Sequence, residues 1–127
     1  MQDRKVFEYA IIRVVPRIER EEFMNVGVML FCKSTRYLGC LYAVDAARLN
    51  AFAPSLDQEE VLSHLQAFQN IATGSKEGGE LALLDPPSRF RWLTAIRSTI
   101  VQTGRVHPGL CSDPALCLQR LFDTLVL

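Results

Sequence analysis

The chain has 127 residues, of which 49% are hydrophobic and 22% are charged. Its 14 Lys and Arg residues balance its 14 Asp and Glu residues, so the formal net charge is zero. This composition is typical of one globular domain, expected over residues 1–127, and it argues against a disordered chain, collagen, a coiled coil or a dedicated nucleic-acid binder, which usually carries a basic domain.

Apolar runs are short throughout the chain. None approaches the ~20 residues that a transmembrane helix needs, and the longest, residues 26–32, has the length of a strand. The first ten residues carry several charges and lead directly into an apolar β-type run, so no signal peptide is expected. We therefore expect a cytoplasmic, bacterial protein that does not associate with membranes.

The first half of the chain predicts three strands. Residues 7–15 are rich in β-branched and aromatic side chains, and Pro16 ends this run because proline has no N–H to give to a sheet. Residues 26–32 are apolar on both faces, which predicts a central strand covered on both sides. Gly27 within this run indicates a bulge or a close backbone contact. A polar turn then leads to a third strand over residues 37–44, in a hairpin with the second.

Two helices and a loop follow the predicted hairpin. Asp45 is placed to cap a short helix that ends at a proline. Ser55 and Gln58 fit a capping box for a longer helix over residues 56–72. Residues 73–80 contain three glycines and mixed charges, and they predict a mobile surface loop.

The second half predicts two more helices and one strand. Asp85 and the two prolines after it indicate the start of a helix over residues 87–95. Residues 98–102 predict a fourth strand, with a continued helix as the alternative, and residues 103–112 predict a loop. Asp113 begins a last helix. The buried stripe of that helix should contain Leu118, Leu121, Phe122 and Leu125. The resulting order, βββ-α-α-α-β-α, is an α+β fold in which helices pack on an antiparallel sheet of about four strands.

Arginine is concentrated in a stretch that lacks acids. Four arginines and no carboxylate lie between Asp85 and Asp113. Arginines without nearby partners either pair with carboxylates elsewhere in the fold or remain available to an anion. Surface pairing of Arg89 or Arg91 with Asp85 or with acids near residues 19–22 is the alternative, at about 0–1 kcal/mol per pair. The predicted anion- or partner-binding residues are Arg89, Arg91, Arg97, Ser98, Thr99, Arg105 and His107.

The same stretch contains two alternating pairs of side chains. Arg89 and Arg91 are two residues apart on a helix and cannot share one face, and the same holds for Phe90 and Trp92. One member of each pair should face the core. We expect Trp92 to be a core anchor rather than a stacking platform for single-stranded nucleic acid.

His107 is the one candidate for catalysis. It lies in a Val-His-Pro-Gly turn, and a loop histidine is suited to proton transfer. A small hydrolase or nuclease-like enzyme, with His107 as acid/base and Arg97 as charge stabiliser, is therefore the alternative function. Because no motif places a nucleophile, we favour a non-enzymatic binding or accessory module.

Metal and cofactor sites are not expected. The four cysteines form no C-x-x-C pair, and Cys32 and Cys40 lie in predicted strands, where a free Cys behaves as a small hydrophobe. Cys111 is the exception to consider, since it lies in the predicted loop near His107. The acids at positions 19, 21 and 22 alternate with arginines and predict a solvated face rather than a metal site.

Two blocks of sequence resemble a bacterial family known as domain of unknown function 3037: FEYAIIRVVPRIEREEFMNVGVMLF and RFRWLTAIRSTIVQTGRVHPGL. The resemblance covers almost the whole chain and implies no established activity. Members are often encoded beside a protein that looks like a toxin-type kinase, so the resemblance implies a partner protein of that kind. A phosphorylated small molecule is the other expected partner, and nucleic acid is not expected. The family pattern tends to have proline where this chain has Ile96, which leaves the strand-or-helix choice after that position open.

Overall fold

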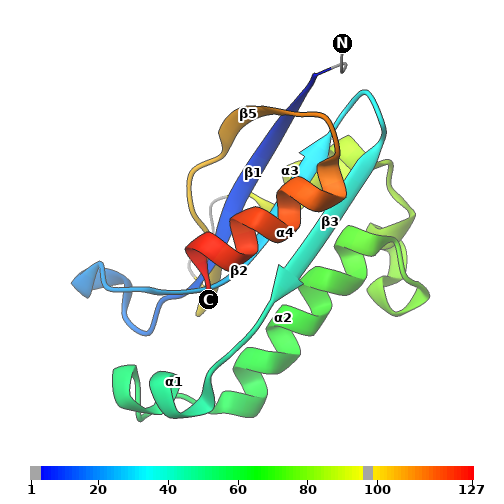
Figure 1. Ribbon diagram of the computed structural model, residues 1–127. Coiled ribbons are helices and arrows are strands. Elements are labelled where there is room, and N and C mark those ends of the chain that lie inside the picture. Colours follow the sequence, from blue (N-terminus) through cyan, green and yellow to red (C-terminus); the bar gives the residue numbers. More distant parts are fainter. Residues whose placement is uncertain (1–3, 96–98) are drawn as a thin grey trace.

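The computed structural model describes residues 4–95 and 99–127. It is an α+β fold in which a five-stranded antiparallel sheet has helices on both faces (Figure 1). The strands are β1 (Lys5–Val14), β2 (Met24–Cys32), β3 (Tyr37–Tyr42), β4 (Val101–Thr103) and β5 (His107–Cys111). The α-helices are α1 (Ala46–Phe52), α2 (Gln58–Thr73), α3 (Pro86–Leu93) and α4 (Pro114–Leu125), and the 3₁₀ segments are η1 (Ile18–Arg20) and η2 (Lys76–Leu83). None of these described helices is both long and apolar enough to cross a membrane.

Strand β1 is the centre of the arrangement. One of its sides pairs with β2, which pairs in turn with β3. Its other side pairs with two short strands, β4 opposite Ile12–Val14 and β5 opposite Lys5–Tyr9. Strands β4 and β5 therefore act as one interrupted edge strand, and both strands lie beside β1 although they begin about ninety residues after it ends.

Strand β5 corrects the predicted loop over residues 103–112. The sequence His-Pro-Gly at its start argued against a strand, because proline cannot donate a hydrogen bond to a neighbour. In the fold, Pro108 lies opposite Glu8, and among the described strands only β1 pairs with β5. The missing N–H is therefore tolerated at the edge of the sheet. The predicted fourth strand over residues 98–102 is confirmed only near its end, since β4 begins at Val101. Helix α3 ends at Leu93, two residues before the predicted end of this helix at residue 95.

Strand β2 is central and covered on both faces, as its apolar sequence predicts. It lies between β1 and β3, and eight of its nine residues are buried. The predicted irregularity at Gly27 is also confirmed: the pairing register shifts between Ile12 and Arg13, so that Gly27 and Asn25 face consecutive residues of β1. A Cβ at residue 27 would lie only 2.8 Å from the carbonyl oxygen of Leu41.

Alternation along the strands builds a separate apolar core on each face of the sheet. On the side of α2 and α3, the rings of Phe31 and Phe90 stack with centroids 5.4 Å apart. On the other side, helix α4 covers β2 and β3. The predicted stripe of α4 is confirmed, because Leu118 and Phe122 are buried while Leu121 and Leu125 are half-buried.

Aspartates begin each of the four α-helices. As predicted, the carboxylates of Asp45, Asp85 and Asp113 accept hydrogen bonds from backbone N–H groups of the first helical turn. The predicted capping box of α2 is wrong. Asp57 caps this helix, and Gln58 instead donates its side-chain amide to a backbone carbonyl of α1, which ties the two helices together.

The segment after α2 is also more regular than predicted. Residues 73–80 were expected to form a mobile loop, but most of them belong to α2 or to the 3₁₀ segment η2. The side chain of Ala82 in η2 is buried, and Leu81 packs against the core on the α2 side. Apolar side chains just beyond the glycines therefore anchor a segment whose composition alone suggested an exposed loop.

Candidate functional site

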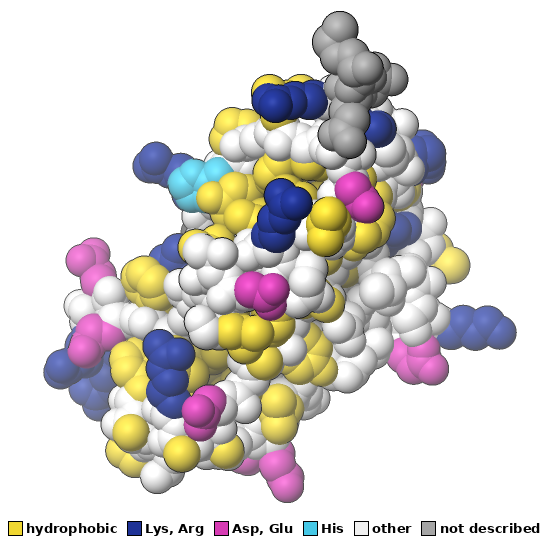
Figure 2. Space-filling model, viewed as in Figure 1, with side chains coloured by type: hydrophobic (Ala, Val, Ile, Leu, Met, Phe, Trp, Pro, Cys, Tyr) yellow, Lys and Arg dark blue, Asp and Glu magenta, His cyan; other side chains and the backbone are white. Residues whose placement is uncertain are grey.

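The predicted arginine-rich surface is divided between two faces of the sheet. Arg89 and Arg91 lie on α3, which packs on the face opposite α4, whereas Arg105 and His107 belong to the edge formed by β4 and β5. Thr99 precedes β4, and the predicted site residues Arg97 and Ser98 lie outside the described residues. On the face covered by α4, Figure 2 shows Lys and Arg side chains spread singly with Asp and Glu between them, so the face has no single large basic patch.

Arg89 is bound to the backbone of its own fold. Its Nη1 donates to the carbonyl oxygen of Leu84 at 2.7 Å, and its Nη2 donates to that of Ala72 at 3.5 Å. Carbonyls near the end of a helix lack helical partners, so this guanidinium stabilises the end of α2. The predicted alternative, in which Arg89 pairs with an acid, is not what the structure shows.

Arg91 is exposed on the other face of α3, as the two-residue spacing predicts. The pKa of the nearby Asp85 carboxyl is lowered, first by its hydrogen bonds with Ser88 and to a smaller extent by the charges of Arg91 and Arg36. The aromatic pair, Phe90 and Trp92, also divides between core and surface as expected, but Phe90 and not Trp92 faces the core. Phe90 is the buried anchor at 3% exposure, whereas Trp92 is 38% exposed, so the prediction of Trp92 as a core anchor is wrong.

His107 lies on β5 rather than in a loop. It pairs with Tyr9 of β1, and the two rings are 5.3 Å apart with an angle of 30° between their planes. The imidazole is exposed, and within the described part of the chain no carboxylate forms an ion pair with it. Arg105, in the short segment between β4 and β5, is likewise exposed and unpaired among these residues. The enzyme alternative stays a prediction, since no acid–base pair involving His107 supports it.

The fold adds to Arg105 a second cation, Arg13 of β1, that the sequence analysis missed. Its guanidinium carbon lies 3.9 Å from the centre of the Phe23 ring. A Cβ at Gly104 would collide with its Nη2, so the guanidinium lies against the backbone of the edge strand. The Nε atom is buried and has no hydrogen-bond partner among the described residues. The available signal was that Arg13 interrupts the apolar run of residues 9–15.

Arg13 and Arg105, which we call the edge cations, follow the same edge of the sheet as His107. Arg13 pairs in register with Gln102, contacts Gly104 next to Arg105, and lies on the same face of β1 as Tyr9, the partner of His107. A guanidinium stacked on an aromatic ring is held in one orientation and partly desolvated, which strengthens its attraction for a carboxylate or phosphate. The edge cations can therefore bind an anion, since no carboxylate within the described ranges forms an ion pair with either of them.

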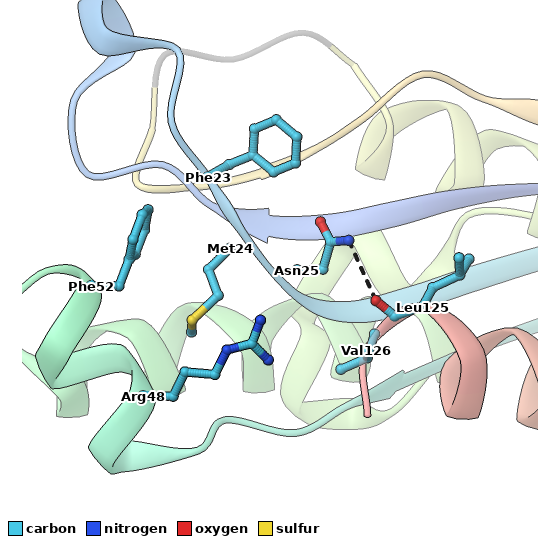
Figure 3. Close-up of a pocket in the computed structure, with 7 residues that line it drawn as sticks. All are labelled: Phe23, Met24, Asn25, Arg48, Phe52, Leu125 and Val126. Atoms are coloured by element: carbon cyan, nitrogen blue, oxygen red, sulfur yellow. Dashed lines mark hydrogen bonds between the residues drawn. The ribbon is translucent and has the colours of Figure 1, made fainter.

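A separate hollow of about 240 Å³ lies near the end of α4. Figure 3 shows Arg48 reaching into it from α1, with Phe23 and Phe52 on the other sides. Asn25 at the start of β2 donates from Nδ2 to the carbonyl oxygen of Leu125 at 3.4 Å, which joins two walls of this hollow. The sequence analysis placed none of these residues in a site, because they come from three distant segments.

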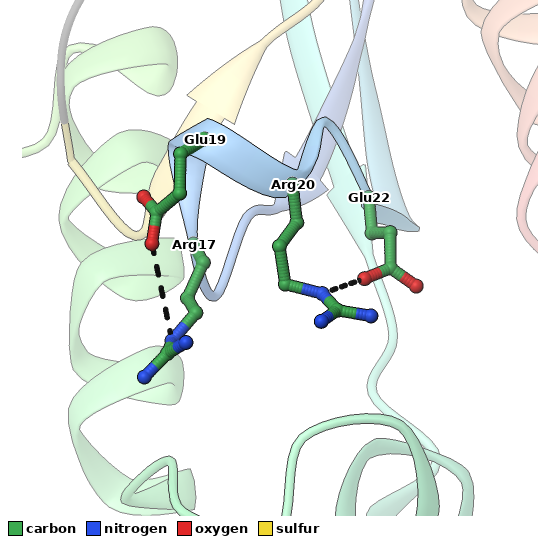
Figure 4. A network of polar contacts seen from close by, with 4 residues as sticks. All are labelled: Arg17, Glu19, Arg20 and Glu22. Carbon is green, nitrogen blue, oxygen red and sulfur yellow. Dashed lines mark hydrogen bonds and ion pairs between the residues drawn. The ribbon is translucent and has the colours of Figure 1, made fainter.

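The acidic segment around η1 forms local ion pairs. Figure 4 shows Arg17 beside Glu19, at 4.0 Å, and Arg20 beside Glu22. All four side chains are more than half exposed, which confirms the predicted solvated face. Among the described residues no group of three His, Cys, Asp or Glu side chains is placed to hold a metal ion.

The thiols are free and largely shielded. Cys32 and Cys40 are buried in strands, as predicted, and burial raises the pKa of Cys40 to about 12. Cys111 lies at the end of β5 rather than in a loop, and burial raises its pKa as well. The same cause raises the pKa of Cys117 in α4. The thiols of Cys40, Cys111 and Cys117 are therefore poor sources of thiolate at neutral pH.

Comparison with known proteins gives one match. The sequence model of a family described as "Protein of unknown function (DUF3037)" matches residues 9–126, which is nearly the whole chain. No curated protein and no solved structure matches significantly.

Proposed function

Because the chain belongs to the DUF3037 family, whose description assigns no activity, we propose from its geometry that it is a non-enzymatic binding module. The edge cations, Arg13 and Arg105, together with the side chain of His107, bind an anionic group carried by a phosphorylated small molecule or by a partner protein. The observation that carries this proposal is the placement of Arg13. Its guanidinium is held between the Phe23 ring and the backbone of Gly104 and faces no carboxylate among the described residues.

The electrostatics of the edge support a small anion. Arg105 and His107 are exposed, so they can reorient toward a ligand, whereas Arg13 is fixed and half-buried. A fixed guanidinium loses little freedom on binding, and charge-assisted hydrogen bonds to it are about twice as strong as neutral ones. A net charge of zero and the mixed surface in Figure 2 argue against a long polyanion such as nucleic acid.

A partner protein is the second source of the anion. The resemblance noted above places toxin-type kinases beside members of this family, and such a protein is the first candidate partner. An acidic loop or a phosphorylated residue on it would present the same chemistry to the edge cations.

The test is a thermal-shift screen of the full chain with inorganic pyrophosphate, nucleotides and sugar phosphates. A ligand at a hundred times its dissociation constant adds about 2.7 kcal/mol, which raises Tm by several degrees. We expect a shift with one phosphorylated class, and Arg105→Gln should weaken that binding about tenfold. The matched control is Arg120→Gln, which removes an equally exposed arginine from α4 and should leave the binding unchanged.

Two results would overturn the proposal. One is equal binding of the same ligand by wild type and by Arg105→Gln and His107→Gln. The other is a flat screen together with no association between the purified chain and the kinase-like partner in a direct titration.

A further inference from the structure

The hollow between α1, the start of β2 and the end of α4 has the features of a second binding site. Its volume is about 240 Å³. Its lining residues are Phe23, Met24, Asn25, Arg48, Phe52, Leu125 and Val126. It differs from the edge cations in its residues, since five of its seven lining residues are apolar and Arg48 is the one charged group, and it shares with them only the ring of Phe23, on which Arg13 stacks.

The walls of this hollow are held in place by buried contacts. Leu49, next to Arg48 on α1, is fully buried in the core on the α2 side, so it anchors the helix that carries Arg48. Val126 is buried in the core on the α4 side, and the Asn25–Leu125 hydrogen bond joins β2 to the last turn of α4. The hollow is therefore preformed, which reduces the ordering cost of filling it.

Arg48 is the single charged group in the lining. Its backbone N–H donates to the carboxylate of Asp45 at 3.1 Å, as part of the cap of α1. No carboxylate among the described residues forms an ion pair with its guanidinium. Figure 3 shows the guanidinium pointing toward the wall formed by Asn25, Leu125 and Val126. A second hollow of about 470 Å³ shares Met24, Asn25, Arg48 and Val126 with the first and is also lined by Asp45.

The apolar part of the lining determines what else a ligand must have. The rings of Phe23 and Phe52 come from separate segments, and Phe23 is 47% exposed. Filling the space between them with an apolar group removes this surface from water, at roughly 25 cal/mol per Å². A bare inorganic anion would leave the apolar surface of the two rings exposed to water.

We propose that this hollow binds a small amphipathic carboxylate, with its carboxylate on the guanidinium of Arg48 and its apolar body between Phe23 and Phe52. One guanidinium matches one carboxylate in charge and in bidentate geometry. The volume lies below the ~300–1,000 Å³ of pockets for drug-sized ligands, so the apolar body is no larger than one aromatic ring or a branched aliphatic chain.

The test is an isothermal titration of the full chain with 3-phenylpropanoate. We expect saturable binding that is weakened about tenfold by Arg48→Gln and partly kept by Arg48→Lys. The uncharged 3-phenylpropanamide and the short anion acetate should each bind at least about tenfold more weakly, since each lacks one half of the recognised chemistry. Arg120→Gln, the matched control, should bind 3-phenylpropanoate as wild type does.

Each other outcome contradicts the inference. Equal affinity for the amide would make the hollow merely apolar, and equal affinity for acetate would make Arg48 an ordinary surface cation. Absence of saturable binding at millimolar concentration by a wild-type chain that unfolds cooperatively would also refute it. Arg105→Gln should leave this binding unchanged, so failure here is distinguishable from failure of the proposed function at the edge cations.

Discussion

Replacing Gly104 by alanine is expected to displace the guanidinium of Arg13 from the ring of Phe23. The new Cβ would occupy the position of Nη2, and the guanidinium is the mobile end of a long side chain, so it moves while the strand backbone stays. A cation–π contact contributes about 0.5–1 kcal/mol at exposed sites and about 2 kcal/mol or more when desolvated. Because Phe23 is 47% exposed and Arg13 is half-buried, we expect about 1 kcal/mol for this contact.

The single variant does not isolate this contribution. Alanine at a glycine position also reduces the entropy of the unfolded chain, which stabilises the protein by about 0.4–1 kcal/mol where the backbone allows it. A double-mutant cycle with Phe23→Ala removes this difficulty. Phe23→Ala should cost about 0.5–1 kcal/mol less in the Gly104→Ala background than in wild type, because the ring has already lost its cation.

Urea unfolding measures all four corners of this cycle. Trp92, the only tryptophan, reports by fluorescence, and far-UV circular dichroism provides a second probe. The control is a cycle that combines Phe23→Ala with Leu62→Ala, which truncates an exposed leucine on α2. The two effects in this control cycle should be additive within about 0.3–0.5 kcal/mol. If the Gly104–Phe23 cycle is equally additive, Arg13 is not held as we describe, and the observation that carries the proposed function is lost.

Three further results are expected. Arg89→Met should lower the free energy of unfolding by about 1–3 kcal/mol, because two backbone carbonyls lose their donor; an unchanged urea midpoint would contradict this. Because the pKa of Asp85 is lowered from its ordinary value of 3.8, the ionised carboxylate stabilises the fold above that pH. This stabilisation is lost as the pH falls through the folded-state pKa, so Asp85→Asn should flatten the acid side of a plot of Tm against pH. Iodoacetamide should label the half-buried Cys117 well before Cys40, whose burial raises its pKa to about 12; mass spectrometry of the digested protein would reveal the reverse order.

Side chains of β1 also restrict which residue types can occupy the neighbouring edge of the sheet. They lean over the edge strand at two places: Arg13 over Gly104 and Phe7 over Gly109. A Cβ at either glycine would collide with them. The glycines that made residues 103–112 read as a loop are thus the residues that allow β4 and β5 to approach β1, and this is why composition was misleading there.

The sequence by itself determined the features that depend on neighbours along the chain. Asp45, Asp85 and Asp113 cap helices because each carboxylate reaches the backbone N–H group three residues further on. The apolar run of β2 required burial on both faces, and the stripe on α4 followed from helical spacing. These local patterns were sufficient to predict the α+β class and most element boundaries.

Only the tertiary structure decided which residues meet across the sheet. Arg13 and Gly104 are more than ninety positions apart, and nothing near either residue in the chain indicates that they touch. The hollow at Arg48 likewise needs α1, β2 and the end of α4 together. Pairing of distant segments is selected by the burial of the whole core, and the energy of that burial is shared among all the strands and helices. A site formed between such segments therefore leaves no signature in any one stretch of sequence.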